Sequence, residues 1–252
     1  MDDIVIVGTV DTEAELDRLA RQYRSAGGVG VQLLNTLGSG AESLLERLPG
    51  PVRDNLQSGT EQALQLAMRA ANRSRDAVPD QAAWVNTAVA TAMGAAGGFG
   101  GISTAVVELP ATTTLLLRSI QGVARAEGFD PTAQNVQFDC IRVFSAAGPL
   151  RKDDGADLGF LATRMAVTGP ALRAAIASVS PKLAAVLGQK LAAQTLPVLG
   201  SVAGATTNLV YAKYYQQIAS VHFGLRRLAI DADVPHPELV ARLRQRMELP
   251  RE

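Results

Sequence analysis

The chain has 252 residues, of which 41 are alanine and only 4% are aromatic, and its 24 Lys and Arg residues balance 24 Asp and Glu residues. Alanine favours helices, whereas sheets favour aromatic and β-branched side chains, so the composition argues against a β-sandwich or barrel and predicts an all-α protein. The balanced charge argues against nucleic-acid binding, and a single cysteine with two histidines argues against a metal site.

The N-terminal part of the chain is predicted to be a short extended arm followed by helices. Residues 4–10 form an apolar run typical of an arm or edge strand. Thr12 and Glu15 have the spacing of a capping box, and the glycines at 27–30 are expected to end the helix that it opens. The expected helices lie at 12–24, 29–47 and 54–73, with Pro49-Gly50-Pro51 as the stop between the last two. We interpret residues 1–75 as a helical extension.

Residues 76–252 are predicted to form a denser helical unit that packs with this extension. Gly128 is expected to end one helix, and Asp130-Pro131 to cap and open the next. Pro110 and Pro170 are expected to interrupt their helices. The expected helices are one begun by Asp80, then 102–127, 131–146, 156–178, one begun by Ser180-Pro181, 199–230 and 238–248. The predicted fold is a compact multi-helix bundle with long central helices interrupted by glycine and proline.

Two long stretches, residues 85–107 and 191–212, contain no charged residue. Each is long enough to cross a hydrocarbon layer of ~30 Å, yet both are rich in Ala, Gly and Thr. Three interpretations stay open: buried core helices, reversible contact with a membrane, and true spans. Glycines four residues apart share a helix face and let a second backbone approach closely. Such packing glycines are Gly94, Gly97, Gly98, Gly101, Gly200 and Gly204.

Several polar side chains interrupt or border the apolar helices, and they are the candidate site. They are Glu108, Arg118, Asn208, His222, Arg226 and Arg227. Because a buried charge is costly unless paired, Glu108 is expected to meet Arg118, Asn208 or one of the arginines at 226 and 227 across helices. His222 and Arg226 are four residues apart and share a helix face. The cluster is either a structural network, or a pocket for an anionic head group or an acid–base pair formed by Glu108 and His222. Cys140 is expected to be a small core residue.

The order of these residues resembles the bacterial EcsC family over roughly residues 80–232. In the first half the resemblance lies in Glu108-Leu109-Pro110, Leu116, Arg118-Ser119-Ile120, Gly128, Asp130-Pro131 and Cys140-x-x-Val143-Phe144. In the second half it lies in Pro197-x-x-Gly200-x-x-x-Gly204-x-x-x-Asn208 and His222-Phe223-x-x-Arg226-Arg227-Leu228. The resemblance implies a helical domain of bacterial origin in a family named after a protein encoded beside an ABC transporter. It supplies no reaction.

The pattern as a whole favours a non-catalytic protein that associates reversibly with the inner membrane through its two uncharged, glycine-rich segments. The expected partners are membrane lipid or an ABC-transporter-type membrane protein, and no cofactor is expected. The start of the chain lacks the basic region of a secretory signal, so we expect a cytoplasmic protein that lies peripherally on the inner membrane. One alternative is a hydrolase that acts on a lipid or peptide with Glu108 and His222. Another is a lipid or fatty-acid binding protein. The sequence specifies no oligomeric state.

Overall fold

The computed structural model describes residues 10–37, 46, 48–77, 109–144, 146, 161, 169–194 and 200–248. Within these ranges the chain forms seven helices and no strand, which confirms the prediction of an all-α bundle. The predicted arm at 4–10, apart from its last residue, and the predicted helix begun by Asp80 lie outside the described residues. The candidate Glu108 and the glycines at 94, 97, 98 and 101 also lie outside them.

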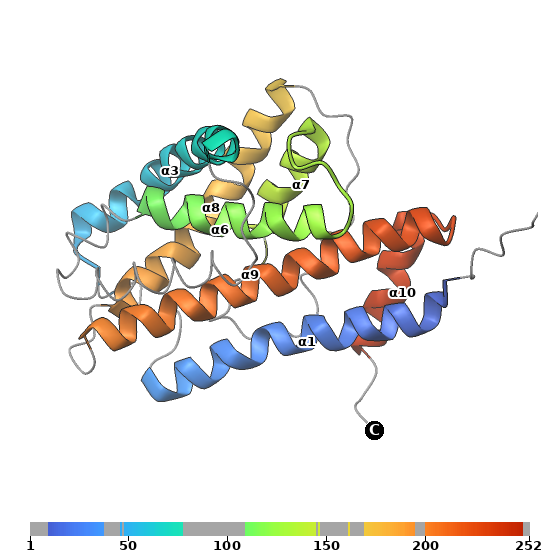
Figure 1. Cartoon of the computed structure of the whole chain (residues 1–252). Helices are drawn as coiled ribbons and strands as arrows, with labels where there is room; N and C mark the ends of the chain where they lie inside the picture. The colour runs from blue at the N-terminus through green and yellow to red at the C-terminus, as the bar shows by residue number, and fades with distance from the viewer. Residues whose placement is uncertain are drawn as a thin grey trace, which may run out of the picture.

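The longest helix, α9 (Gly200–Asp231), runs through the middle of the molecule and contacts α1 (Thr12–Leu37) on one side and α6 (Leu109–Ala126) on another (Figure 1). Helix α1 is antiparallel to α9: the Gln217 amide nitrogen lies 3.4 Å from the Ser25 hydroxyl, and Gly224 faces Leu19. Helix α6 runs in the same direction as α9, and its C-terminal end meets α9 where Phe129 contacts Phe223.

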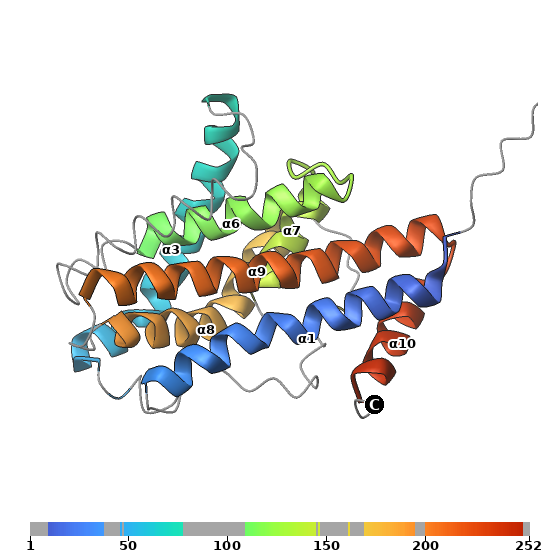
Figure 2. The ribbon, with the colours of Figure 1, turned by 60° about the horizontal axis from the view of Figure 1, so that its bottom comes forward.

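The remaining helices surround this centre. Helix α3 (Gly50–Ala77) packs on α6 and on α8 (Gly169–Gln194), while the short α7 (Gln134–Val143) packs on α6, α8 and α9. Helix α10 (His236–Glu248) crosses under the start of α1 beside the end of α9, as Figure 2 shows. The last described helix therefore lies beside the start of the first.

One apolar core connects all these helices. Its largest fully buried side chains come from α1, α3, α6, α8, α9 and the end of α7: Leu16, Leu19, Leu64, Leu116, Leu117, Ile120, Phe144, Lys190, Tyr211, Tyr215 and Phe223. Helix α3 contributes Leu56, Leu64, Ala67 and Met68 to this core. Cys140 is fully buried in this core, as expected of a small core residue.

The start of α1 differs from the prediction, because Asp11 rather than Thr12 caps it. One Asp11 carboxylate oxygen accepts hydrogen bonds from the backbone N–H groups of Glu13 and Ala14, both at 3.1 Å. The side chain of Glu15, which a capping box directs back to the cap residue, instead binds Arg18. Aspartate is as good a cap as threonine, so the first turn is satisfied one residue earlier.

The predicted break at glycines 27–30 is also wrong, because α1 continues through them to Leu37. A glycine costs a helix only about 1 kcal/mol relative to alanine. Packing of α1 along α9 outweighs that local penalty. Gly28 has open space where a Cβ would lie, so no close approach of another segment requires glycine there.

Two proline-rich boundaries are shifted. Gly50 and Pro51, expected to separate helices, form the first turn of α3, where the missing N–H of proline is not needed. Asp130-Pro131 does not open α7: the Asp130 carboxylate accepts a 2.8 Å hydrogen bond from the Thr132 N–H within a turn. Helix α7 begins only at Gln134 and ends at Val143 rather than near residue 146.

Helix α8 corrects a further prediction, because it runs without interruption through Pro181. A proline inside a helix removes one backbone hydrogen bond, so two helices were expected there. Beside the proline, the Ser180 hydroxyl donates to the Ile176 carbonyl at 2.7 Å, one turn back along the same helix. Pro170 lies in the first turn of α8, where it costs nothing. The residues predicted as helix before 169, apart from Leu161, lie outside the described residues.

Other boundaries are confirmed to within two residues. Helices α9 and α10 match the predicted 199–230 and 238–248. Gly128 ends α6 in the left-handed region at φ 82°, and the Phe129 N–H reaches back to the Ala124 carbonyl at 2.9 Å. Helix α9 ends in the same manner with Asp233 at φ 51° in the position that glycine usually occupies. Among the described residues, no helix is long and apolar enough to cross a membrane.

Candidate functional site

A cluster of charged side chains joins α7 to α9 at the level of the α6–α7 turn. The Asp139 carboxylate of α7 lies between two side chains of α9: one oxygen forms an ion pair with the Arg226 guanidinium, and the other lies 3.5 Å from Nε2 of His222. Arg142, one turn further along α7, also acts on the Asp139 charge. The cluster contains two of the six predicted candidates, and Asp139 is the carboxylate that unites them.

Helix geometry accounts for this arrangement. His222 and Arg226 are four residues apart on α9 and therefore lie on one face. On α7 the buried positions Val136, Cys140 and Val143 form the stripe that faces the core. Asp139 lies on the same stripe, three residues after Val136 and four before Val143, so its carboxylate points at α9 rather than at solvent.

Burial and charge act in opposite directions on Asp139. Burial alone would raise its pKa, but the hydrogen bond and charge of His222, together with the charges of Arg226 and Arg142, outweigh it, so the pKa of Asp139 lies below its ordinary value. Burial lowers the pKa of Arg142, although the Asp139 charge opposes that shift. Asp139 is thus held as a carboxylate at neutral pH.

Aromatic rings cover the cluster. The Arg226 guanidinium lies over the Phe129 ring at 4.6 Å from its centre, a distance suited to cation–π attraction. Phe129 in turn contacts Phe223 with ring centres 5.6 Å apart. Phe129 follows Gly128 directly, so the left-handed turn at the end of α6 places this ring over Arg226. The α6–α7 turn therefore covers the cluster of Asp139, Arg142, His222 and Arg226 that connects α7 to α9, which we call the polar joint.

The chemistry open to this joint is limited by access. A histidine beside a carboxylate is an arrangement used for general acid–base catalysis. Here the His222 side chain is 1% exposed, while Asp139 and Arg226 are about 14% and 15% exposed. In this conformation the imidazole is enclosed by protein, and the contacts of the cluster hold α7 against α9.

The other predicted candidates lie elsewhere. Asn208 is buried on the same side of α9 as His222, four turns nearer its start, and Arg118 is half-buried on α6. Arg227 does not join the cluster: its side chain is half-exposed and forms a 2.7 Å ion pair with Asp231, one turn further along α9. Gly200 and Gly204 lie in the first two turns of α9. The predicted pairing of Glu108 falls outside the described residues.

A second buried polar region lies where α8 and α9 approach their connection. Tyr211 donates its hydroxyl to the Val186 carbonyl of α8 at 3.1 Å, and burial raises the pKa of Tyr211. One turn nearer the connection lie Lys190 on α8 and Asn208 on α9, each 1% exposed. A fully buried lysine is rare, because its charge must be compensated inside the protein.

Sequence reasoning missed Asp139 and Lys190 for different reasons. Asp139 was visible only as an acid on an apolar stripe, and its partners are more than 80 residues away in the chain. Lys190 immediately precedes the uncharged stretch at 191–212 and lies between Leu187 and Leu191, which are both fully buried. In each case a charged residue at a core position of a helix indicates the site. A search for uncharged stretches does not detect such a residue.

Residues 51–228 match the family described as the EcsC protein family. The match begins in the first turn of α3, earlier than the resemblance at 80–232, and ends near the end of α9. Helices α1 and α10 lie outside it. No curated protein and no solved structure matches the chain.

Proposed function

This chain belongs to the EcsC protein family. We propose that it is a non-catalytic protein that associates reversibly with the inner membrane or with a membrane transporter. Residues 85–107 and 191–212 make the contact, and the protein is a cytoplasmic one that lies peripherally on the membrane. The proposal assigns no reaction and requires no cofactor.

The observation that carries this proposal is the burial of an uncharged segment inside a bundle. The described part of 191–212 lies in the core: Leu191, Ala192 and Ala212 are fully buried, and Val210 is 4% exposed. The described ends of this uncharged segment are thus held away from water by neighbouring helices rather than displayed. Transfer from the bundle to lipid exchanges one apolar environment for another, which makes a reversible association energetically feasible.

Buried polar groups make the packed state less favourable and so support reversibility. The Thr112 hydroxyl, the Gln121 amide and the Tyr215 hydroxyl are buried and have no hydrogen-bond partner among the described residues. Each such group costs roughly 1–3 kcal/mol in a packed core. These groups lie on α6 and α9, where the bundle holds the uncharged segment. Packing at this interface is therefore weaker than its apolar area implies.

One observation favours the hydrolase alternative, namely the carboxylate beside His222. A hydrolase with His222 as the general base requires the ring to reach the substrate, and the enclosure of the ring opposes this. If hydrolysis of lipid or peptide esters is detected, His222→Gln should lower kcat by about 100-fold or more. Arg227→Gln, at an exposed position outside the cluster, is the matched control and should leave kcat unchanged.

Flotation of the purified chain with lipid vesicles tests the proposal. We expect it to float with vesicles at both low and high salt, because apolar contact resists salt whereas charge attraction is screened. Native mass spectrometry of the same sample reports any lipid that copurifies, which is the outcome expected of a lipid carrier.

A pair of matched variants locates the contact. Ala96→Glu places a charge in the middle of 85–107 and should reduce salt-resistant binding by about tenfold or more, since a carboxylate in hydrocarbon is costly. Ala111→Glu adds the same charge at an exposed position of α6 and should bind like the unaltered chain. Failure of the unaltered chain to float with any vesicle, or equal binding by the two variants, would contradict the proposal.

A further inference from the structure

Helix α10 lies outside the family match, and its sequence has the amphipathic pattern typical of helices that bind at a membrane surface. Its apolar residues Leu239, Val240, Leu243 and Met247 form one stripe along the helix. Basic side chains border this stripe on both sides, Arg242 and Arg246 on one flank and Arg244 on the other. An apolar stripe between basic flanks is the pattern of helices that lie in the plane of an anionic membrane surface.

In the bundle this stripe is turned inward. Leu239 and Leu243 are fully buried, Val240 is 4% exposed, and Met247 packs against the core. The 13-residue helix is attached to α9 through a short connection that holds Asp233 in the left-handed region. The main helix contacts of α10 are with α1 and α9, so its departure would leave the packing among α3, α6, α7 and α8 in place.

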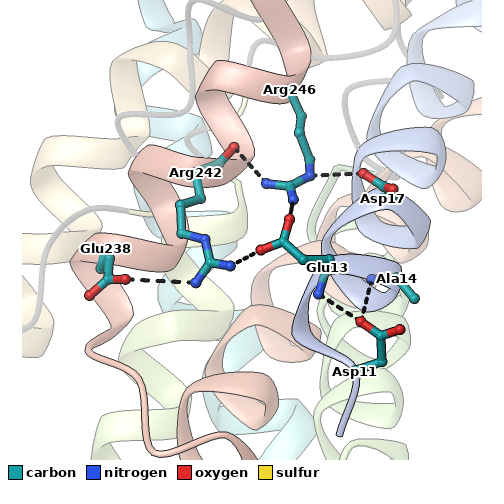
Figure 3. Close-up of polar contacts among 7 residues, drawn as sticks. All are labelled: Asp11, Glu13, Ala14, Asp17, Glu238, Arg242 and Arg246. Atoms are coloured by element: carbon teal, nitrogen blue, oxygen red, sulfur yellow. Dashed lines mark hydrogen bonds and ion pairs between the residues drawn. The ribbon is translucent and has the colours of Figure 1, made fainter.

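Acidic residues of α1 hold one basic flank, as Figure 3 shows. The Glu13 carboxylate forms ion pairs with both Arg242 and Arg246, and Asp17 accepts a 2.8 Å hydrogen bond from Arg246. Arg24 of α1 donates to the Arg246 carbonyl near the end of α10. These contacts, which we call the latch, join the first helix of the chain to its last.

We propose that α10 is a binding site for anionic lipid, and that the latch keeps it on the bundle until lipid phosphates replace Glu13 and Asp17 as partners of Arg242 and Arg246. This inference rests on the proposed membrane association and names one element that drives it.

The ion pairs of Arg242 and Arg246 with the α1 carboxylates are about as strong as their contacts with lipid phosphates would be. Lipid can therefore replace the carboxylates. The Glu13 side chain is 61% exposed and that of Asp17 is 56% exposed. An exposed ion pair changes an equilibrium by less than about fivefold. An arginine close to an anionic bilayer contributes roughly the same factor. Arg244 is exposed and takes no part in the latch, so its charge stabilises only the membrane-bound state of α10. Burial of the apolar stripe in the bundle is replaced by its burial among lipid chains.

The test compares single substitutions that change the charge equally. Vesicles of phosphatidylcholine, with and without phosphatidylglycerol, are titrated into the full chain at low salt, and partitioning is measured by flotation. Glu13→Gln removes two latch contacts and should tighten binding to the anionic vesicles by roughly three- to fivefold. Glu15→Gln makes the same charge change two residues away, where the carboxylate contacts Arg18 of its own helix, and should leave binding unchanged.

A third variant separates lipid contact from latch strength. Arg244→Gln leaves the latch residues intact and should weaken binding to anionic vesicles by about fivefold with no change in thermal unfolding. Equal binding by the Glu13→Gln and Glu15→Gln variants, or unchanged binding by Arg244→Gln, would overturn the inference. If the chain still floats at high salt in that case, membrane association through the uncharged segments survives without α10. If the chain binds no vesicle, both proposals fail together.

Discussion

Asp139 is the residue on which the polar joint between α7 and α9 depends. Its carboxylate has Arg226 on one oxygen and His222 at 3.5 Å from the other, and Arg142 lies one turn away. Breaking a buried ion pair on one side costs more than the pair itself contributes, because the remaining charges keep their desolvation penalty. Removal of the Asp139 charge therefore leaves two arginines without their common partner.

Asp139→Asn keeps the shape of the side chain and removes the charge. We expect it to lower the free energy of unfolding at pH 7 by roughly 2–3 kcal/mol, below the cost at a fully buried site because the joint is partly exposed. Urea titration of both proteins measures the difference. A change of less than about 0.5 kcal/mol would show that the joint does not stabilise the fold.

The same pair of proteins yields a pH dependence. The folded state lowers the pKa of Asp139 from its ordinary value of 3.8, so its stabilising effect is complete above that value and is lost as the pH falls through the lower folded-state pKa. The difference in unfolding free energy between the two proteins should stay constant from pH 7 to about pH 5 and then shrink as the solution is acidified. A difference that grows below pH 4 would contradict the assignment.

Two residues that end helices in the left-handed region should respond to substitution with opposite signs. Gly128→Ala introduces a Cβ at φ 82°, 3.2 Å from an Arg227 nitrogen, and should lower stability by about 1–2 kcal/mol. Asp233→Gly relieves the strain at φ 51° and should raise stability by about 0.5–1 kcal/mol. Thermal unfolding measures both, and shifts of the same sign would contradict this account of the helix ends.

At the scale of residues, the sequence predicts the two members of the polar joint that lie on α9 but not their partner on α7. The spacing of His222 and Arg226 on one helix is local information, and it correctly places both side chains together. Their partner Asp139 comes from another helix, and only the packing of α7 on α9 selects it over the other acids of the chain. A single sequence carries no signal for that choice.

At the scale of elements, Gly224 lies where the Leu19 side chain of α1 packs on α9. A Cβ at this position would lie 2.8 Å from Cδ2 of Leu19, which is fully buried on α1. Such contacts do not occur in real structures without movement of one partner. The Leu19 side chain thus fills the space that a Cβ at position 224 would need. Helix α1 covers the face of α9 that lies opposite α7.

Gly224→Ala should force the buried Leu19 side chain out of its packed position and lower the free energy of unfolding by roughly 1–3 kcal/mol. Gly28→Ala is the matched control, because this helical glycine of α1 has open space around it and should gain about 0.5–1 kcal/mol. Shortening the partner in the double variant Gly224→Ala with Leu19→Val should recover part of the loss. Urea titrations measure the series, and two single variants of equal effect would contradict the close approach.

Helix boundaries show where local rules fail. Helix α9 was predicted correctly, since no proline interrupts it and its end carries a turn. Helices α1 and α8 were each divided, at glycines 27–30 and at Pro181, although both run through. Packing against α9 and α3 contributes more than the local penalty of about 1 kcal/mol for a glycine or about 3 kcal/mol for a proline. Such tertiary compensation is absent from any local pattern.

At the scale of the whole molecule, helices from both ends of the chain pack beside α9, the last helix of the family match at 51–228. Helix α1 covers one side of α9, and α10 joins α1 through the latch. The composition alone predicts the all-α fold, because alanine-rich and aromatic-poor chains rarely form sheets. The pairing of α10 with α1 was not predicted, since its ion pairs join residues more than 220 positions apart.

The central claim is that the uncharged segments reach lipid, and Trp84 offers the most direct measurement. It is the chain's single tryptophan and immediately precedes residues 85–107. Its fluorescence should be recorded with vesicles whose acyl chains carry bromine, a quencher that acts only at close range. The account predicts strong quenching that persists at high salt. Unquenched Trp84 emission from chains that have floated with the same vesicles would contradict it.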